Sequence, residues 1–435
     1  MNVLIGVTGG IAAYKVCEVV STLAKSGIEV RVLMTQQAQR FVSAVTFAAL
    51  SRHAVYTDAD FWSEQSQIEV TSVAQPNTQS GYRPLHIALG EWADVFLIAP
   101  LTANSLAKLT SGLADNLLTN TVLASVCPVL LAPAMNTDMW QQQAVQRNWQ
   151  SLLTDSRYHA VGPGAGRLAC DRIGTGRMAE PAEIVAYLSS LLYTQGRRDL
   201  AGRHLLISAG STQEYLDPVR FIGNPSTGRM GIALAVAAQH RGAQVTLVHG
   251  PLSSAIAATI PAGIHAIAIT TAAEMEQAML TRLSEADWVI MAAAIADVRP
   301  TATAPSKLPK HQLPAQLPLE SVPDIVAQLS ARKSAGQKVI GFAAQTGEIV
   351  TPAIAKLRRK QLDAIVANPV DQPDSGFGSP DNEAVILAAD GTELRVERSS
   401  KLHLAHCLYD FLLRSTDSTL ATQVLALEES LGEES

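Results

Sequence analysis

One cysteine, Cys170, lies within a glycine-rich segment at residues 162–178 that has glycines on both sides of it. An ordinary cysteine thiol has a pKa of about 8.5, so it is mostly neutral at pH 7 and can donate a proton. Because glycine lets the backbone hinge, the segment can act as a flap that carries this thiol over a pocket. The same pattern also suits an irregular surface loop without a chemical role, and the neighbouring motifs must decide between the two.

Four short motifs in the first half of the chain each follow an apolar run or begin a helical pattern. They lie at residues 9–15, 99–104, 112–118 and 133–136. If the apolar runs are parallel strands, the motifs meet at the carboxyl edge of one sheet, where α/β proteins bind ligands. The first motif is not the G-x-G-x-x-G fingerprint, and the chain has no G-x-x-x-x-G-K-[ST] P-loop. Its glycine turn before a helix suits a phosphate group, although a plain strand–helix turn fits equally well.

Two polar residues beside these motifs are candidates for proton transfer and binding. His86 precedes a strand that ends at this edge, and near neutral pH an imidazole accepts a proton at little cost. A lone histidine is more often structural, so both interpretations stand. Asn136 can donate its amide N–H to a carboxylate, and it can also cap the next helix. The two roles of Asn136 are compatible.

The second half holds a glycine-rich stretch at 216–231 that resembles a degenerate P-loop without its lysine and hydroxyl. A structural loop that caps a helix is the alternative. Residues 291–297 end a strand on small side chains, which lets a flat ligand approach the backbone. Lys356 and Lys360 are four residues apart and share one helical face, for which a solvated basic surface is the common explanation.

Short apolar strands alternate with amphipathic helices along the chain, which predicts parallel sheets covered on both faces. The fold class we expect is α/β, with two Rossmann-like three-layer domains and mainly parallel sheets. We place the domains at 1–193 and 204–415, with a linker at 194–203. An insertion at 63–85 and an acidic tail at 416–435, partly disordered, complete the chain. The expected strands are 2–7, 28–34, 94–99 and 128–132, then 204–210, 244–249, 265–269, 288–292, 339–342 and 364–366, before a late hairpin or helix.

Composition restricts the functional class. The net charge is −6 and the pI is near 5.9, which argues against a general nucleic-acid binder. The four cysteines form no CxxC pair, so neither a zinc site nor a disulfide framework is indicated. The apolar runs are too short to span a membrane, and the chain shows no leader pattern. We therefore expect a soluble cytoplasmic protein.

Taken together, the motifs of the first half, with His86 and Cys170, resemble the FMN-containing cysteine decarboxylase family. Those of the second half, including residues 216–231, 291–297, 323–326 and 341–344, resemble the phosphopantothenate–cysteine ligase domain. In this order they resemble the bacterial bifunctional phosphopantothenate–cysteine ligase/phosphopantothenoylcysteine decarboxylase family of coenzyme A biosynthesis. The resemblance covers about residues 1–412.

The resemblance implies two linked reactions. CTP, with magnesium, would activate 4′-phosphopantothenate as an acyl-cytidylate, and cysteine would then displace CMP. Asn224 would hold this intermediate and Lys307 would neutralise charge on the reacting phosphate. FMN would then oxidise the thiol of the product so that carbon dioxide leaves, and reduced flavin would return the electrons to give 4′-phosphopantetheine. His86 would assist the oxidation, Asn136 would bind the carboxylate and Cys170 would supply the proton.

The resemblance also implies two sets of binding residues. The FMN set is Gly9, Gly10, Ile11, Thr35, Pro100, Thr102, Ala103, Asn104, Asp115, Asn116 and Met135. The CTP set is Met291, Ala292, Ala293, Asp297, Lys307, Pro323, Asp324, Ile325, Val326, Phe342, Lys356 and Lys360. No protein ligand to a metal is assigned, since magnesium would arrive with the nucleotide.

The family further implies a large homo-oligomer, a dodecamer built from trimers of the first domain and dimers of the second. Five positions depart from the usual family strings: Asp171, Arg229, Pro309, Gln345 and Pro380. Two alternatives remain open. A flavin-fold regulatory protein without catalysis would not need His86, Asn136 and Cys170, and a peptidyl-cysteine decarboxylase would not need residues 204–412.

Overall fold

A computed structural model describes residues 1–61, 83–167, 173–313, 315–371, 376, 378–379 and 381–414. The chain divides into two compact units, Met1–Arg197 and Arg198–Ser435, and each is described by itself. Cys170, Asp171, Pro380, the expected tail and most of the expected insertion lie outside the described residues. Within the described ranges, no helix is both long and apolar enough to cross a membrane.

Unit 1 alternates strands and helices as the sequence predicts. Its elements are β1 (Asn2–Val7), α1 (Ala13–Lys25), β2 (Glu29–Met34), η1 (Ala38–Arg40), α2 (Ala44–Ser51), β3 (Val55–Thr57), α3 (Asp58–Phe61), α4 (Leu85–Trp92), β4 (Val95–Leu101), α5 (Ala103–Ser111), α6 (Leu117–Ala124), β5 (Val129–Pro133), α7 (Thr137–Gln141), α8 (Gln143–Leu152), β6 (Tyr158–Ala160), β7 (Gly164–Arg167), β8 (Ile173–Arg177) and α9 (Pro181–Thr194).

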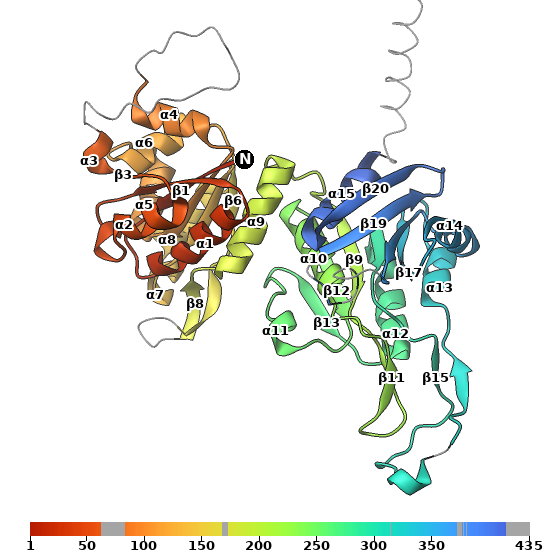
Figure 1. Cartoon of the computed structure of the whole chain (residues 1–435). Coiled ribbons are helices and arrows are strands. Elements are labelled where there is room, and N and C mark those ends of the chain that lie inside the picture. The colour runs from red at the N-terminus through yellow and green to blue at the C-terminus, as the bar shows by residue number, and fades with distance from the viewer. Residues whose placement is uncertain are drawn as a thin grey trace, which may run out of the picture. The chain divides into compact units, whose positions relative to one another are not determined.

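The main sheet of unit 1 has the order β3-β2-β1-β4-β5-β6, and every neighbouring pair in it is parallel. Helices α1, α2 and α9 pack on one face, and α4, α5, α6 and α8 pack on the other (Figure 1). Both faces are therefore buried, which explains why the strands read as continuous apolar runs. The chain reverses its direction of strand addition between β1 and β4, so a crevice forms there at the carboxyl ends of the strands.

The segment at 162–178, for which the sequence allowed a flap or an irregular loop, contains paired strands. Its two flanks, β7 and β8, pair as antiparallel strands, and Cys170 falls outside the described residues. The glycines hide this hairpin from sequence analysis, because they leave no alternation of apolar and polar side chains to read.

Unit 2 has the same alternation. Its elements are β9 (His204–Ala209), β10 (Gln213–Tyr215), β11 (Phe221–Gly223), α10 (Arg229–His240), β12 (Gln244–His249), α11 (Ser254–Ala257), β13 (His265–Ala268), α12 (Ala272–Arg282), η2 (Leu283–Glu285), β14 (Trp288–Met291), β15 (Val298–Pro300), η3 (Lys310–Gln312), β16 (Leu319–Ser321), α13 (Ile325–Arg332), β17 (Lys338–Gln345), α14 (Val350–Arg359), β18 (Ala364–Pro369), β19 (Asp381–Ala388), β20 (Glu393–Ser400) and α15 (Lys401–Arg414).

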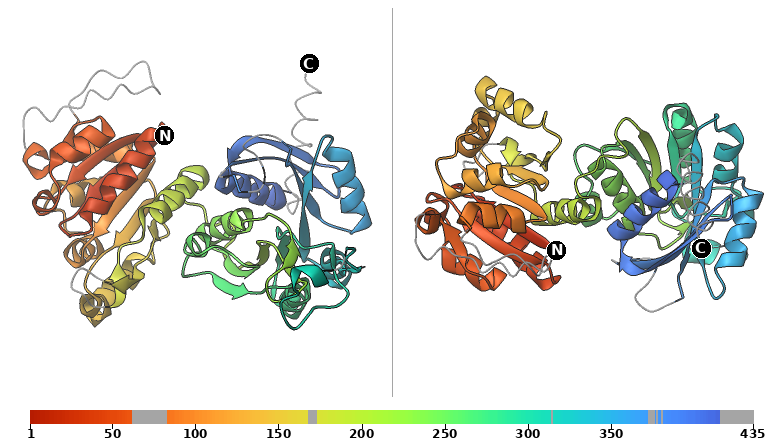
Figure 2. Two further views of the ribbon diagram at one scale, coloured as in Figure 1. Left: turned by 60° about the horizontal axis from the view of Figure 1, so that its bottom comes forward. Right: turned by 90° about the horizontal axis from the view of Figure 1, so that it is seen from above.

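The eight-stranded sheet of unit 2 has the order β13-β12-β9-β14-β17-β18-β19-β20. The pairs from β13 to β18 are parallel, and β19 and β20 are antiparallel. Helices α10 and α15 cover one face, and α12, α13 and α14 cover the other (Figure 2). The expected α/β class with mainly parallel sheets is confirmed in both units. The late hairpin or helix is in fact a hairpin, β19–β20, followed by a helix, α15.

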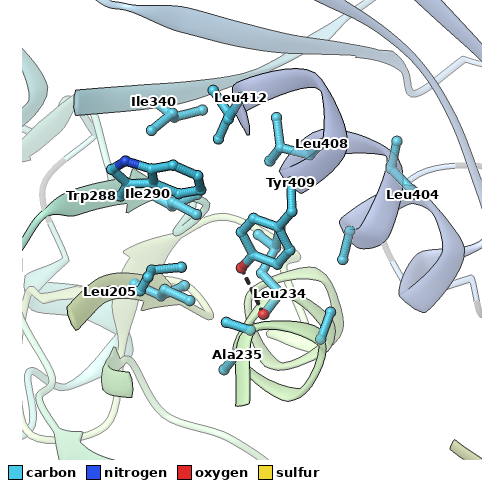
Figure 3. Packing of buried hydrophobic residues seen from close by; sticks show 14 of the residues in the cluster. Leu205, Leu234, Ala235, Trp288, Ile290, Ile340, Leu404, Leu408, Tyr409 and Leu412 are labelled. Carbon is cyan, nitrogen blue, oxygen red and sulfur yellow. Dashed lines mark hydrogen bonds between the residues drawn. The ribbon is translucent and has the colours of Figure 1, made fainter. Parts of the chain in front are cut away.

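Two buried aromatic side chains pack in the core between the sheet, α10 and α15. Trp288 and Tyr409 stack with ring centroids 6.2 Å apart, and the Tyr409 hydroxyl donates to the carbonyl of Leu234 at 2.7 Å (Figure 3). Nearby, the buried Arg241 guanidinium donates to the carboxylates of Asp199 and Asp410. Arg241 therefore ties the first turn of unit 2 and α15 to the end of α10.

Candidate active sites

A cavity of about 940 Å³ opens at the carboxyl ends of β1, β2, β4 and β5 in unit 1. This is the crevice at which the strand order reverses. Of the residues expected to bind FMN, those that line the cavity are Gly9, Gly10, Ile11, Thr35, Thr102, Ala103, Asn104, Asn116 and Met135. Pro100 and Asp115 do not line it. The Pro100 ring lies behind the Gly10 turn, and Asp115 pairs with Lys108, which does line the cavity, at 2.6 Å.

Two helices that start at this edge, α5 and α6, have side-chain N-caps. The Thr102 hydroxyl accepts from the N–H of Ser105, and Asn116 forms a capping box with Thr119. These caps fix where the two helices begin and satisfy one N–H of each first turn, and the positive end of each helix dipole at this edge suits an anion. The cavity thus combines backbone donors with the apolar side chains of Ile11 and Met135.

Asn136 has the capping role that the sequence allowed for it, and its position at the cavity leaves the predicted carboxylate contact open to it. Its side-chain oxygen accepts from the N–H of Asp138 at 2.8 Å and caps α7, and the residue lines the cavity. Met135, just before it, donates its N–H to the carbonyl of Gly176 at 2.9 Å. The hairpin β7–β8 is therefore attached to the cavity wall, beside the described stem of the Cys170 segment.

Four cationic side chains to which the sequence assigned no role lie at this cavity. Lys15, Lys108, Arg167 and Arg177 all line it. The Glu180 carboxylate accepts from Lys15 at 2.9 Å and pairs with Arg177 at 2.7 Å. Lys15 was visible as the last residue of the first motif, but nothing in its spacing showed which way it would point.

His86 is not among the residues that line the cavity of unit 1. It lies in the first turn of α4 and packs edge-to-face on Phe61, with ring centroids 5.4 Å apart. Burial lowers the pKa of His86, so its imidazole is neutral at pH 7 and can accept a proton. Its Nδ1 atom is buried and has no hydrogen-bond partner among the described residues.

A second cavity, of about 520 Å³, lies in unit 2 where the strand order reverses between β9 and β14. Every residue expected to bind CTP except Lys307 lines it, and so does Asn224. The lining residues from that prediction are Met291, Ala292, Ala293, Asp297, Pro323, Asp324, Ile325, Val326, Phe342, Lys356 and Lys360. Asn224 donates its amide to the carbonyl of Ile295 at 3.1 Å, which holds its side chain beside the small residues after β14.

Lys356 and Lys360 have specific partners in this cavity. Lys360 pairs with the Asp324 carboxylate at 2.8 Å, and Lys356 donates to the carbonyl of Phe342 at 3.4 Å. Burial lowers the pKa of Lys356, and the charge of Lys360 lowers it further. Burial alone would raise the pKa of Asp324, but hydrogen bonds from Lys360 and from the N–H of Ala327 hold it below its usual range. The solvated-face explanation for this lysine pair is wrong.

Lys307 lies on an exposed loop outside the cavity. The next residue, Leu308, is held at both of its backbone groups. Its N–H donates to the buried Asp217 carboxylate at 3.2 Å, and its carbonyl accepts from Arg220 at 2.9 Å. The stem of the Lys307 loop is thus fixed to the turn between β10 and β11, which lie away from the main sheet (Figure 1).

Several lining residues of the second cavity were missed by sequence analysis. Gly228 is the N-cap of α10 with φ +83°, a conformation that favours glycine, and Arg229 begins the helix. The other missed residues with polar side chains are Ser226, Thr227, Asn368, Asn382 and Lys401. Among the described residues, no group of three or more His, Cys, Asp or Glu side chains is arranged to hold a metal ion.

Two family models match this chain. Residues 1–193 match the family model described as Flavoprotein, and residues 200–415 match that of the DNA/pantothenate metabolism flavoprotein C-terminal domain. The coenzyme A biosynthesis bifunctional protein CoaBC of Bacillus subtilis (strain 168) is 41% identical over 405 residues, 93% of this chain and 94% of that protein. The protein of the same name from Vibrio cholerae is 38% identical over 413 residues, 93% of this chain and 98% of that protein. This chain belongs to the CoaBC family.

Solved structures also match single units. The C-terminal domain of a CoaBC protein is 30% identical, with a TM-score of 0.43, and covers 51% of this chain and 98% of that chain. A PPC decarboxylase mutant complexed with pantothenoylaminoethenethiol is 34% identical, with a TM-score of 0.38, and covers 44% of this chain and 98% of that chain.

Membership of the CoaBC family confirms the predicted function at the level of its two activities. The chain is a bifunctional enzyme of coenzyme A biosynthesis, a phosphopantothenate–cysteine ligase and a phosphopantothenoylcysteine decarboxylase. Both units are covered by the CoaBC relatives, which does not fit a peptidyl-cysteine decarboxylase without residues 204–412. Of the departures from the family strings, Arg229 lines the second cavity, Gln345 ends β17 and Pro309 precedes η3.

Proposed function

We propose that unit 2 couples 4′-phosphopantothenate to cysteine with CTP, and that unit 1 decarboxylates the product with FMN to give 4′-phosphopantetheine. The observation that carries this proposal is the pair of separate cavities, one in each unit. Each lies at the point where the strand order of its sheet reverses, and each is lined by most of the residues expected for one of the two reactions.

The cavity of unit 1 has the donors and walls that FMN requires. Ile11, Met135, Met139 and Met178 give it apolar surfaces for a flat ring system. Gly9 is required in this turn, since a Cβ added there would overlap Gln37, and both Gly9 and Gly10 line the cavity with backbone atoms. The starts of α1 and α5 offer backbone N–H groups for a phosphate. The residues present therefore fit the cofactor.

When bound, FMN supplies the two-electron exchange that the decarboxylation needs. The protein contributes binding and proton transfer. Asn136 would donate its amide N–H to the substrate carboxylate, since its side-chain oxygen already caps α7. His86, neutral because it is buried, would accept a proton during oxidation of the thiol. Cys170 would return a proton to the product at the end of the reaction.

In unit 2 the residues would bind CTP and stabilise the acyl-cytidylate. The small residues 291–293 after β14 let the nucleotide approach the backbone, and Lys356 and Lys360 place positive charge beside it. Asn224 would hold the intermediate. Lys307 would neutralise charge on the reacting phosphate, and magnesium would accompany the triphosphate because hard oxygen ligands suit it.

We further infer a homo-oligomer, a dodecamer of trimers and dimers, in the cytoplasm. Large apolar side chains are exposed on both units, among them Val126 at 90% and Val45 at 75% in unit 1. In unit 2, Val219, Phe221 and Leu319 are exposed on or beside the small strands β11 and β16. Contacts between subunits would remove these apolar side chains from water. His86 and Lys307 do not line the cavity of their own unit. In an assembly, each could reach the corresponding cavity of a neighbouring copy of the chain.

The flavin content of the purified protein tests the assignment of unit 1. We expect a yellow protein that releases FMN on denaturation. A colourless protein that fails to take up added FMN would overturn the role of the first cavity, whatever the activity of unit 2.

A further inference from the structure

Lys401 is a buried lysine in the second cavity that has no assigned role. It is 7% exposed, begins α15 and lines the cavity together with Gly376, Gly378 and Asn382. Its ammonium group donates to the carbonyl of Gly376 at 3.3 Å and to the carbonyl of Asp381 at 2.9 Å. Lysine side chains are almost never buried to this extent unless the ammonium group is paired.

The two carbonyls accept only two of the hydrogen bonds that the Lys401 ammonium group can donate. A charged lysine has three N–H donors, and two of them bind the segment that ends at Asp381. One donor and the full positive charge remain for a ligand in the cavity. A neutral amine still has two N–H donors, so it could hold the two carbonyls but could not provide the charge.

The position of Lys401 in the fold separates it from the lysines already assigned. Helix α15 packs with α10 on one face of the sheet, whereas α14, which carries Lys356, packs on the other face. Arg229 reaches the same cavity from the first turn of α10. The cavity therefore receives positive charge from both faces of the sheet, and Lys401 and Arg229 supply the side next to the N-terminus of α10.

We propose that Lys401 is an anion-binding residue of this cavity and that, with Arg229, it binds the phosphate groups of the nucleotide beyond the first. This inference rests on the proposed function of unit 2. Lys401 would hold the polyphosphate that leaves when the acyl-cytidylate forms, and its two carbonyl bonds would keep the ammonium group in place for that task.

The electrostatic surroundings of Lys401 give the proposal a measurable signature. Burial lowers the pKa of Lys401, Asp381 on β19 opposes this effect and the charge of Arg229 adds to it, so that the pKa is about 8. Arg398 on β20 pairs with Asp381 at 3.8 Å. Guanidinium groups and carboxylates ordinarily keep their charge between pH 7 and 9. A lysine with a lowered pKa is therefore the side chain of this cavity that loses its charge between pH 7 and pH 9. Because burial also lowers the pKa of Lys356, substitution of Lys401 is needed to separate the titration of the two lysines.

The test is equilibrium titration of the full-length protein with CTP, CMP and 4′-phosphopantothenate, each with magnesium. The variants are Lys401→Met and a matched control, Lys338→Met. Lys338 is also partly buried and donates to a backbone carbonyl, that of Leu412, but it lies at the amino end of β17, away from the cavity. We expect Lys401→Met to weaken CTP binding about 10- to 100-fold at pH 7, because one charged hydrogen bond is lost. CMP binding should change little. The control should bind both nucleotides like the wild type.

The pH dependence provides a second measurement that does not depend on the variant folding. In the wild type, the preference for CTP over CMP should fall between pH 7 and pH 9 as Lys401 loses its proton. In Lys401→Met that part of the pH dependence should be absent. A wild-type preference that stays constant over this range would overturn the proposal.

Other outcomes are equally decisive. Equal weakening of CTP and CMP binding would show that Lys401 only holds the backbone carbonyls of Gly376 and Asp381. Weaker binding of 4′-phosphopantothenate with unchanged CTP would assign the charge to the other substrate, against the proposal. If the wild type itself binds no CTP, the proposed function of unit 2 fails; if it binds CTP and Lys401→Met binds it equally well, this inference alone fails.

Discussion

The N–H of Met135 and the carbonyl of Gly176 form a 2.9 Å hydrogen bond that joins the end of the β5 region to β8. Gly176 has φ +139°, and a Cβ added there would overlap the carbonyl of Met135. Because Met135 and Asn136 line the cavity of unit 1, the position of the hairpin and the shape of the cavity depend on this glycine.

Gly176→Ala should therefore displace the hairpin from the cavity wall and lower the FMN content and decarboxylase activity by at least tenfold. The ligase activity should stay normal, since it belongs to unit 2. Flavin absorbance per mole of protein is the direct measurement. Gly27→Ala is the matched control, because Gly27 also has a positive φ, +77°, but no atom within 4 Å of an added Cβ. Wild-type flavin content in Gly176→Ala would contradict this account.

Cys170→Ser should stop the decarboxylase late, because a serine hydroxyl is a far weaker acid than a thiol. Carbon dioxide should still be released, while an unsaturated enethiol about two mass units lighter than 4′-phosphopantetheine accumulates. His86→Asn should instead stop the reaction before carbon dioxide appears. Mass spectrometry and carbon dioxide release distinguish the two variants, and a normal yield of saturated product from Cys170→Ser would disprove the role of the thiol.

Lys307→Gln tests the lysine that lies outside the cavity of its own unit. Two unit charges about 4 Å apart interact by about 4 kcal/mol at an effective dielectric of 20, against about 1 kcal/mol in water. A lysine held against the reacting phosphate should thus contribute about two to three decades in rate, and a solvated one almost nothing. We expect release of pyrophosphate to collapse in this variant and decarboxylation of supplied phosphopantothenoylcysteine to survive. Unchanged pyrophosphate release would show that Lys307 is a surface lysine.

His406 predicts a pH dependence of the stability of unit 2. Burial lowers the pKa of His406 to about 4, and the charge of Arg241 contributes, whereas an ordinary histidine has a pKa of 6.5. The folded state therefore favours the neutral ring, and stability present above pH 6.5 is lost as the pH falls toward 4. Between pH 6.5 and pH 5 the loss should be about 2 kcal/mol. Hydrogen exchange of α15 amide groups measures it, and a loss that is no smaller in His406→Gln would rule out this residue as the cause.

Much of the fold followed from the sequence because buried parallel strands carry a strong signal. The expected strands at 2–7 and 244–249 have the observed bounds, since each is an apolar run bounded by turns or polar residues. Short edge strands such as β3 and β6 were missed, because three residues are too few to show a period. The hairpin β7–β8 was missed because glycines carry no pattern.

The binding residues were predicted less evenly. Residues that follow strands, such as Asn104 and Asp297, line the cavities because parallel topology brings strand ends together. Lys401 was missed because a lysine at the start of a helix has the sequence signature of a solvated residue, and only the packing of α15 on α10 buries it. The role of Lys307 came from the family resemblance, and for His86 the sequence left a structural role open. Neither residue lines the cavity of its own unit.

The most direct test of the central claim is to incubate the pure protein with 4′-phosphopantothenate, cysteine, CTP and magnesium, and to follow all products by mass. We expect CMP, pyrophosphate, carbon dioxide and 4′-phosphopantetheine in equal amounts, with phosphopantothenoylcysteine as the intermediate. Omitting cysteine should prevent carbon dioxide release. An active, flavin-containing protein that forms no phosphopantothenoylcysteine, or forms it without converting it to 4′-phosphopantetheine, would contradict the account.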